Sequence, residues 1–199
     1  LKIGLDLGWQ GLLEKIRIYR RVNAPHGSDF YHGIGSVVHG VQNWIRRHAE
    51  AARELAAVET NPDLHQNLIE IATINEHLVT EPPRTFREAC QWILWYQMIA
   101  RMFNGSGSLG RLDVLLTPYY ERDIAADILD DEEAIFHIAC LLLRDTAYIQ
   151  LGGPDASGRD VTNQLSYLVL EAGHRLKIPA NIGVSVGEGI DPELLRRGV

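Results

Sequence analysis

Apolar residues recur every three or four positions along most of the chain, the spacing typical of amphipathic helices. This pattern predicts helices from Trp9 to Arg21 and from Asp29 to about Glu59. A third helix is expected to begin at Asn61-Pro62 and to run to about Val79, because asparagine caps helices and proline is favoured at the first helical position. The chain up to about residue 80 is therefore expected to be helical apart from short gaps.

The start of the next helix is predicted from the residues at its beginning. Pro82-Pro83 interrupts the chain, and Thr85-Phe86-Arg87-Glu88 then has the form of a capping box, in which Thr85 and Glu88 satisfy each other's backbone N–H groups. The helix is predicted to run to about Phe103. Because its residues are apolar nearly all round, we expect it to be buried on several sides.

Helical patterns continue towards the carboxyl end, with one exception. Residues 111–129 are expected to be helical in pieces around Pro118, and Asp130 is expected to cap a helix running to about Ile149. Another helix is predicted from Val161 to Leu176. Only Asn181–Val186 is predicted as a strand, because it is short, β-branched and bounded by proline and glycine.

Composition excludes several classes of protein. The 199 residues carry a net charge of −7, and lysine and arginine form no long run, so we expect no nucleic-acid partner. No segment is apolar for long enough to span a bilayer, and no signal peptide is recognisable, so we expect a cytoplasmic protein without a membrane partner. Cys90 and Cys140 lie within helical patterns and predict packing rather than a disulfide or metal site.

Both ends suggest part of a longer protein. The chain starts at Leu1, and a new helix, with Asp191 as its cap and Pro192 at its first position, has only just begun when the sequence stops. We therefore expect residues 1–199 to be a single partial domain.

A glycine-rich stretch, Phe103 to Asp113, contains the G-x-G-x-x-G spacing at Gly105, Gly107 and Gly110. A dinucleotide-binding loop needs a strand before the first glycine and a helix directly after the loop. Here a long helix precedes the loop. An NAD-binding protein is therefore disfavoured, and a turn joining two helices is expected.

Four stretches, taken in order, resemble the glycyl radical enzymes, which include pyruvate formate-lyase and diol dehydratase-like members. They are a Pro-x-Thr-Phe-x-Glu-Ala helix start at Pro83, Gly-Arg-x-Asp at Gly110, Pro-Tyr-Tyr with a following Asp at Pro118, and Asn-x-x-Ser-Tyr-Leu at Asn163. The resemblance places this chain in the N-terminal half of the family fold. It implies a mainly α fragment of outer helices plus an early strand of a ten-stranded α/β barrel.

The resemblance also implies a reaction whose central groups are not in this chain. Such enzymes carry a backbone glycyl radical, installed by a radical S-adenosylmethionine activase, and a cysteine that becomes a thiyl radical. We match neither group here, so no catalytic residue and no bound cofactor is assigned. A small organic substrate, a homodimer and an anaerobic lyase, dehydratase or formate acetyltransferase reaction are implied for the whole enzyme.

Two loops are expected to line the substrate pocket. The residues proposed from the resemblance are Asn104, Ser106 and Ser108 in the glycine loop and Gly152, Gly153, Thr162 and Asn163 in the later loop. The glycine loop lacks the histidine found in dehydratase-like members, so the substrate is left open. A solvent-facing turn is the alternative for the first loop.

Three charged residues and the histidines are given structural roles. Arg111 and Asp113, with Asp123, are expected to fasten loop to helix through an arginine–carboxylate pair. His32 and His39 are seven apart, but no third ligand accompanies them, so no metal site is predicted. The competing function is a catalytically inactive helical scaffold or binding protein derived from the same fold.

Overall fold

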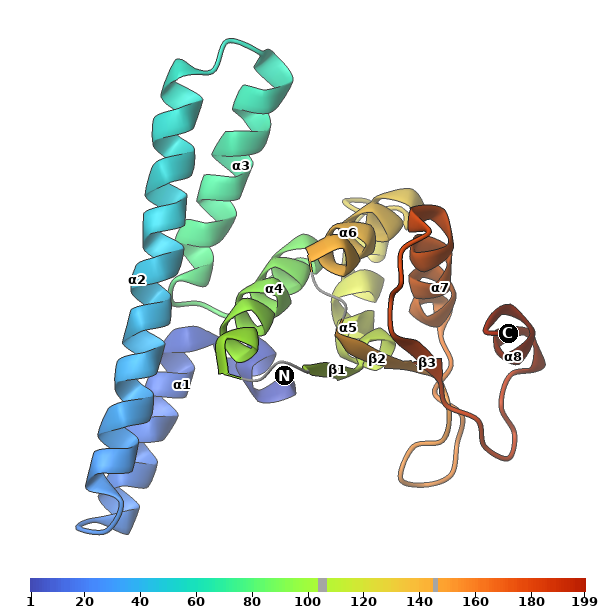
Figure 1. Cartoon of the computed structure of the whole chain (residues 1–199), viewed down its shortest axis with the longest axis horizontal. Coiled ribbons are helices and arrows are strands. Elements are labelled where there is room, and N and C mark those ends of the chain that lie inside the picture. The colour runs from blue at the N-terminus through green and yellow to red at the C-terminus, as the bar shows by residue number, and fades with distance from the viewer. Residues whose placement is uncertain (104–106, 145–146) are drawn as a thin grey trace. The chain divides into compact units, whose positions relative to one another are not determined.

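The structure is a computed structural model that describes residues 1–103, 107–144 and 147–199. The chain divides into two compact units, residues 2–83 and residues 84–199 together with Leu1. Helices dominate both units, as the sequence predicts, and the second unit also contains a small sheet (Figure 1). The expectation of one partial domain over residues 1–199 stays a prediction.

Three helices form the first unit. They are α1 (Lys2–Asn23), α2 (Ser28–Val58) and α3 (Pro62–Leu78), and α2 packs against both others. Ala49, Ala52 and Ala56 on α2 are buried at three- and four-residue spacing, so one stripe of this helix faces the unit's core. The predicted cap of α3 is confirmed, because the Asn61 side chain accepts hydrogen bonds from the N–H groups of Asp63 and Leu64.

Helix α1 extends further than its apolar spacing predicted, and a glycine bends it. Gly8 has a φ of +62°, a left-handed conformation that glycine adopts readily. A Cβ atom at this position would lie 2.5 Å from backbone atoms of Glu81 and Pro82. The N–H of Gln10 donates to the Thr80 carbonyl at 3.0 Å, which joins the start of the unit to its end.

The described part of the second unit contains five helices, α4 (Phe86–Phe103), α5 (Leu112–Ala125), α6 (Asp131–Arg144), α7 (Gln164–Leu176) and α8 (Pro192–Arg197). Helix α4 is less uniformly buried than expected, since Met102 and Phe103 at its end are exposed. Helix α5 continues through Pro118 instead of breaking into pieces. Asp130 caps α6 as predicted, with Asp130 and Glu133 exchanging side-chain to backbone hydrogen bonds.

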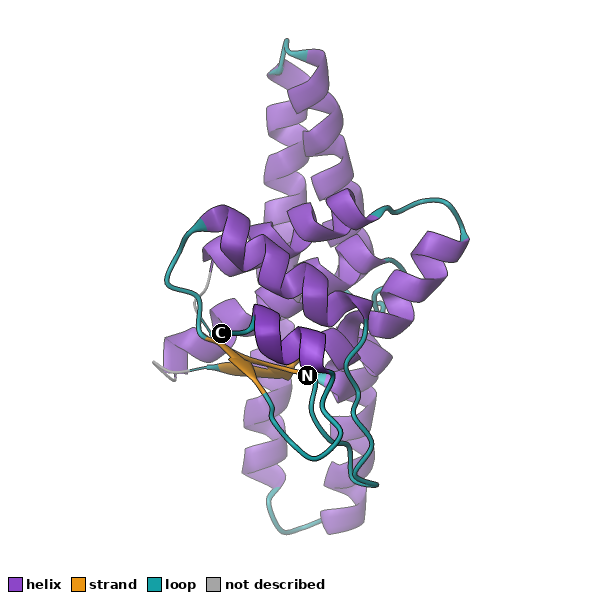
Figure 2. Cartoon of the chain, turned by 90° about the vertical axis from the view of Figure 1, so that its right-hand side faces the viewer, coloured by secondary structure: helices purple, strands orange, loops and turns teal. Residues whose placement is uncertain are grey.

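The sheet has three parallel strands in the order β1 (Ser108–Arg111), β2 (Tyr148–Leu151) and β3 (Ile182–Val184). Figures 1 and 2 show helices of this unit on one side of it. Only β3 was expected. The prediction that Tyr148 and Ile149 end a helix is wrong, as is the prediction of a plain turn at Ser108–Arg111. Strands of four residues carry too little periodicity to be distinguished from a helix end.

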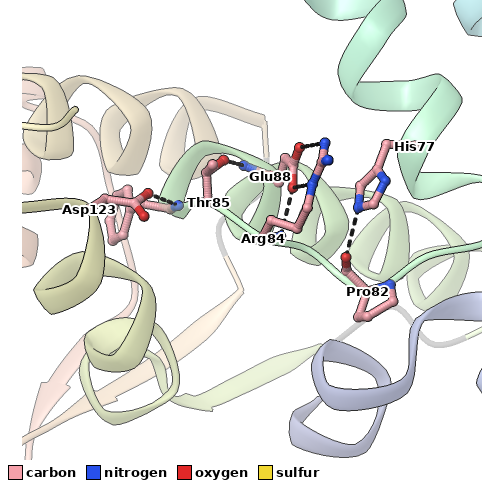
Figure 3. Close-up of polar contacts among 7 residues, drawn as sticks. His77, Pro82, Arg84, Thr85, Glu88 and Asp123 are labelled. Carbon is pink, nitrogen blue, oxygen red and sulfur yellow. Dashed lines mark hydrogen bonds and ion pairs between the residues drawn. The ribbon is translucent and has the colours of Figure 1, made fainter. Parts of the chain in front are cut away.

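The start of α4 is held by carboxylates from near and far (Figure 3). The Thr85 hydroxyl accepts from the N–H of Glu88 at 3.2 Å, which confirms half of the expected capping box. The Glu88 carboxylate accepts from the backbone N–H of Arg84 at 2.6 Å. Asp123, buried on α5, accepts from the N–H of Phe86 at 2.6 Å. This contact supports the structural role expected for Asp123.

A partly buried histidine on α6 gives the second unit a measurable pH dependence. The ring of His137 contacts the rings of Phe86 and Phe136, and burial, with the positive charge of Arg87 nearby, lowers its pKa to about 4. In the unfolded chain this ring binds a proton near pH 6.5. Unfolding therefore takes up a proton between these two pH values, so stability falls as the pH falls from about 6.5 to 4.

When the pH falls from 6.5 to 4, we expect the unfolding free energy of the wild-type chain to fall by about 2 kcal/mol more than that of His137→Phe. This figure is reduced from the full linkage value because His137 is only partly buried. Urea unfolding followed by circular dichroism at several pH values measures the difference. Parallel pH profiles for the two proteins would contradict the assignment of this titration to His137.

Candidate functional site

Ser108, from the first loop expected to line a pocket, and Gly152, from the second, lie at opposite ends of their strands. The glycine loop leads into the amino end of β1, and Gly152 follows the carboxyl end of β2. Because β1 and β2 are parallel, these ends face opposite edges. The sheet places Ser108 beside Tyr148 rather than beside Gly152. Within the described residues, the structure therefore does not bring Ser108 directly together with the residues of the later loop.

Of the first group, Ser108 lies within the described residues, whereas Asn104 and Ser106 lie outside them. Ser108 is exposed at the start of β1. Its hydroxyl donates to the carbonyl of Tyr148 at 3.3 Å and accepts from the N–H of Gly110 at 3.2 Å. These bonds fix the orientation of the hydroxyl at the sheet edge.

Gly152 and Gly153 form the tight turn that leaves β2. Both have positive φ values, 56° and 78°. Their N–H groups donate to two different carboxylates, Gly152 to Asp113 at 2.8 Å and Gly153 to Asp160 at 2.9 Å. The backbone of this turn is therefore held by the side chains of two aspartates, and neither N–H points to open solvent.

Asp113 is the centre of this arrangement. Its side chain is completely buried at the start of α5, and the same oxygen that binds Gly152 also accepts from the hydroxyl of Ser166 at 2.6 Å. The Ser166 hydroxyl in turn accepts from the N–H of Asn163 at 3.1 Å. One carboxylate thus joins the beginnings of α5 and α7 to the end of β2.

Arg111 reaches the same loop by another route. Its guanidinium donates to the carbonyl of Pro154 at 2.5 Å. We expected Arg111 and Asp113, with Asp123, to fasten loop to helix through an arginine–carboxylate pair. The described contacts show Arg111 and Asp113 each fastening the loop after β2 through a backbone partner of its own. The expected effect on the loop is reached through different bonds.

Asp160 is a second organising carboxylate, which the sequence analysis did not identify. It accepts from the hydroxyl of Thr162 at 2.9 Å and from the N–H of Asp191 at 3.0 Å, besides Gly153. Burial acts to raise the pKa of Asp160, but these hydrogen bonds outweigh it and hold the pKa below its ordinary value. The carboxylate is therefore ionised at neutral pH and links the loops that follow β2 and β3.

The remaining predicted residues take part in the same framework. Asn163 caps α7, since its side-chain oxygen accepts from the N–H of Leu165 at 2.9 Å. Thr162 is bonded to Asp160 through both its hydroxyl and its N–H. Sequence reasoning missed Ser166 because its partner Asp113 is 53 residues away. The Asn-x-x-Ser spacing was the available signal, because it places a serine where it can complete a capping box.

The two cysteines differ in their surroundings. Cys90 is buried on α4, as predicted, but the prediction that Cys140 is packed is wrong, because it is exposed on α6. Burial raises the pKa of both thiols, most strongly that of Cys90. Both side chains therefore stay protonated at neutral pH.

Among the described residues, no helix is long and apolar enough to cross a membrane.

Comparisons with known proteins agree with this architecture. Residues 2–199 match the model of the pyruvate formate lyase-like family. The chain is 32% identical over 224 residues to the probable dehydratase YbiW of Escherichia coli K12, covering 96% of this chain and 28% of that protein. It is 32% identical over 153 residues to isethionate sulfite-lyase of Bilophila wadsworthia, covering 65% of this chain and 18% of that protein.

A solved structure shows the same fold. It concerns 1,2-propanediol dehydration in Roseburia inulinivorans, with a TM-score of 0.91 and 26% identity, covering 98% of this chain and 28% of the other. The chain thus spans between about a fifth and somewhat over a quarter of the length of these relatives. With the family model matched from residue 2 to residue 199, this chain belongs to the pyruvate formate lyase-like family of glycyl radical enzymes.

Proposed function

We propose that this chain is part of a glycyl radical enzyme that acts on a small organic substrate as a lyase or dehydratase. The observation that carries the proposal is the family match over residues 2–199. The relatives named above are a sulfite-lyase and a probable dehydratase, and both are several times longer than this chain. Placement in the N-terminal half of such an enzyme is part of the proposal.

The role proposed for these residues is to build and hold one wall of the substrate pocket. The wall comprises the residues proposed from the sequence, namely Asn104, Ser106, Ser108, Gly152, Gly153, Thr162 and Asn163. What supports a rigid wall is the carboxylate framework of Asp113 and Asp160, which holds the turn after β2 by two backbone N–H groups. A pre-organised wall of this kind would position a substrate without reorganising during the reaction.

The radical chemistry itself would come from groups beyond these residues. A glycyl radical, once installed by a radical S-adenosylmethionine activase, supplies hydrogen-atom transfer through a cysteine. Cys90 is unsuited to that task, because it is buried within the helical layer on α4. The activase as partner, a homodimer and a cytoplasmic location are proposed with the function.

The test uses the full-length protein produced anaerobically with an activase and S-adenosylmethionine. Electron paramagnetic resonance is expected to show a glycyl radical, and isethionate and 1,2-propanediol serve as the first probe substrates. Their products would be measured as sulfite and as propionaldehyde. A protein that acquires no radical and binds neither compound would instead support the catalytically inactive scaffold.

A further inference from the structure

The two faces of the small sheet differ sharply in polarity. On β2, Ile149 and Leu151 are buried and face the helices, whereas Tyr148 and Gln150 point the other way and are exposed. Helix α5 packs on β1 and β2 from the buried side. The opposite face, which we call the open face, carries Tyr148, Gln150 and their neighbours on the adjoining strands.

Gln150 occupies the middle of the open face. Its cross-strand neighbours are Arg111 on β1 and Gly183 on β3. A Cβ atom on Gly183 would lie 2.8 Å from the Gln150 amide nitrogen, so the amide lies over this glycine. The hydroxyl of Ser185 donates to the amide oxygen of Gln150 at 3.3 Å. The glycine and the serine therefore place the amide in a defined position.

The polarity of the open face conflicts with ordinary packing. Parallel sheets are almost always covered on both faces, and their strands are then apolar on both sides. This chain is about a quarter of the length of its relatives, which leaves ample chain to cover the face. A face destined for an apolar core would not present an amide, a phenol and a serine, because buried polar groups need hydrogen-bond partners.

A small polar ligand resolves the conflict. The Gln150 amide can both donate and accept, as can the Tyr148 phenol. A hydroxyl group also donates and accepts, so it is matched by an amide in a way that a carboxylate, which only accepts, is not. The neighbouring strand β1 carries a cation, the guanidinium of Arg111. In its described contact this guanidinium donates a hydrogen bond to the Pro154 carbonyl.

We propose that the open face lines the substrate cavity of the whole enzyme and that Gln150 is a specificity-determining residue that hydrogen-bonds a hydroxyl group of the substrate. The proposal rests on the proposed function and deepens it. It adds Gln150, which the sequence did not single out and which Gly183 and Ser185 orient, to the proposed site residues. It also adds a contact on the sheet itself to those proposed for the loops.

The experiment measures binding and turnover by the full-length enzyme with 1,2-propanediol and isethionate as probes. Gln150→Leu removes the amide at nearly constant size, and Gln66→Leu, on the exposed part of α3, is the matched control. We expect Gln150→Leu to weaken the calorimetric Kd of the bound probe and to lower kcat/KM by about 10- to 100-fold. Glycyl radical content and melting temperature should stay at wild-type values.

A second variant tests whether the position of the Gln150 amide matters, as distinct from its presence. Gly183→Ala keeps the amide but displaces it by the collision described above, and we expect a loss of the same direction if it folds. Gln150→Leu could instead have normal radical content and a Kd and kcat/KM within twofold of wild type. That result would overturn the role assigned to Gln150 and leave the proposed function intact. A wild-type enzyme that forms no radical and binds neither probe would overturn both.

Discussion

Replacing Asp113 with alanine is expected to lower the unfolding free energy of the chain by about 3–5 kcal/mol. The side chain is completely buried, and one of its oxygens accepts from both Gly152 and Ser166. Alanine leaves a buried N–H and a buried hydroxyl without their acceptor and opens a cavity where the carboxylate was. Urea unfolding monitored by far-ultraviolet circular dichroism measures the loss.

Two further substitutions sharpen this result. Asp113→Asn keeps the shape, but its amide presents a donor to either the N–H of Val114 or the pair formed by Gly152 and Ser166, so we expect about 2 kcal/mol. Asp127→Asn, on an exposed turn, is the matched control and should change stability by less than about 0.5 kcal/mol. Similar small losses for all three variants would show that the carboxylate does not organise the turn.

Gly153→Ala is expected to lower stability by about 3–5 kcal/mol, because it combines backbone strain with a collision. Gly153 has a φ of +78°, and an added Cβ would overlap the Cβ of Ser185 and lie 2.8 Å from the Ser185 carbonyl oxygen. Neither contact can be relieved by rotating a side chain. The turn would have to move away from the segment that follows β3.

Gly158→Ala is the control for conformation alone. Gly158 has a similar φ of +85° in the same loop, but nothing lies within 4 Å of an added Cβ. We expect about 1–2 kcal/mol, the cost of a left-handed alanine. Chemical denaturation of both variants gives the difference, which reports the collision. Equal losses at the two positions would mean that the close approach of the two loops does not contribute.

Most helices could be predicted because their signals are local. The apolar spacing of α2, the Asn61 cap of α3 and the Asp130 cap of α6 each depend on residues within about one or two turns. The left-handed bend at Gly8 was missed because its cause, the backbone of Glu81 and Pro82, is more than seventy residues away in the sequence.

Strands β1 and β2 were beyond local reasoning. Each has four residues, and pairing joins Ser108 to Tyr148 and Ile149 to Ile182 across long stretches of sequence. Their backbone hydrogen bonds are made only when distant segments meet, so propensity and periodicity give little warning. Ile149 was accordingly assigned to the end of a helix.

The candidate site shows the same division. The resemblance to the glycyl radical enzymes grouped Gly152, Gly153, Thr162 and Asn163 as predicted site residues, and a glycine pair followed by an Asn-x-x-Ser start is readable without a structure. That the N–H groups of the glycine pair are bound by Asp113 and Asp160 was not readable, because a carboxylate's partners depend on where the chain returns in space.

The sequence by itself determined the helices, their caps and the family, because these depend on residue type and on order along the chain. The tertiary structure alone decided the parallel sheet, the carboxylate framework around the turn after β2 and the polarity of the sheet's open face. Apart from the local bond between Gly153 and Asp160, these features arise from contacts between residues about 30–50 positions apart, whose hydrogen bonds and burial exist only after the chain has folded.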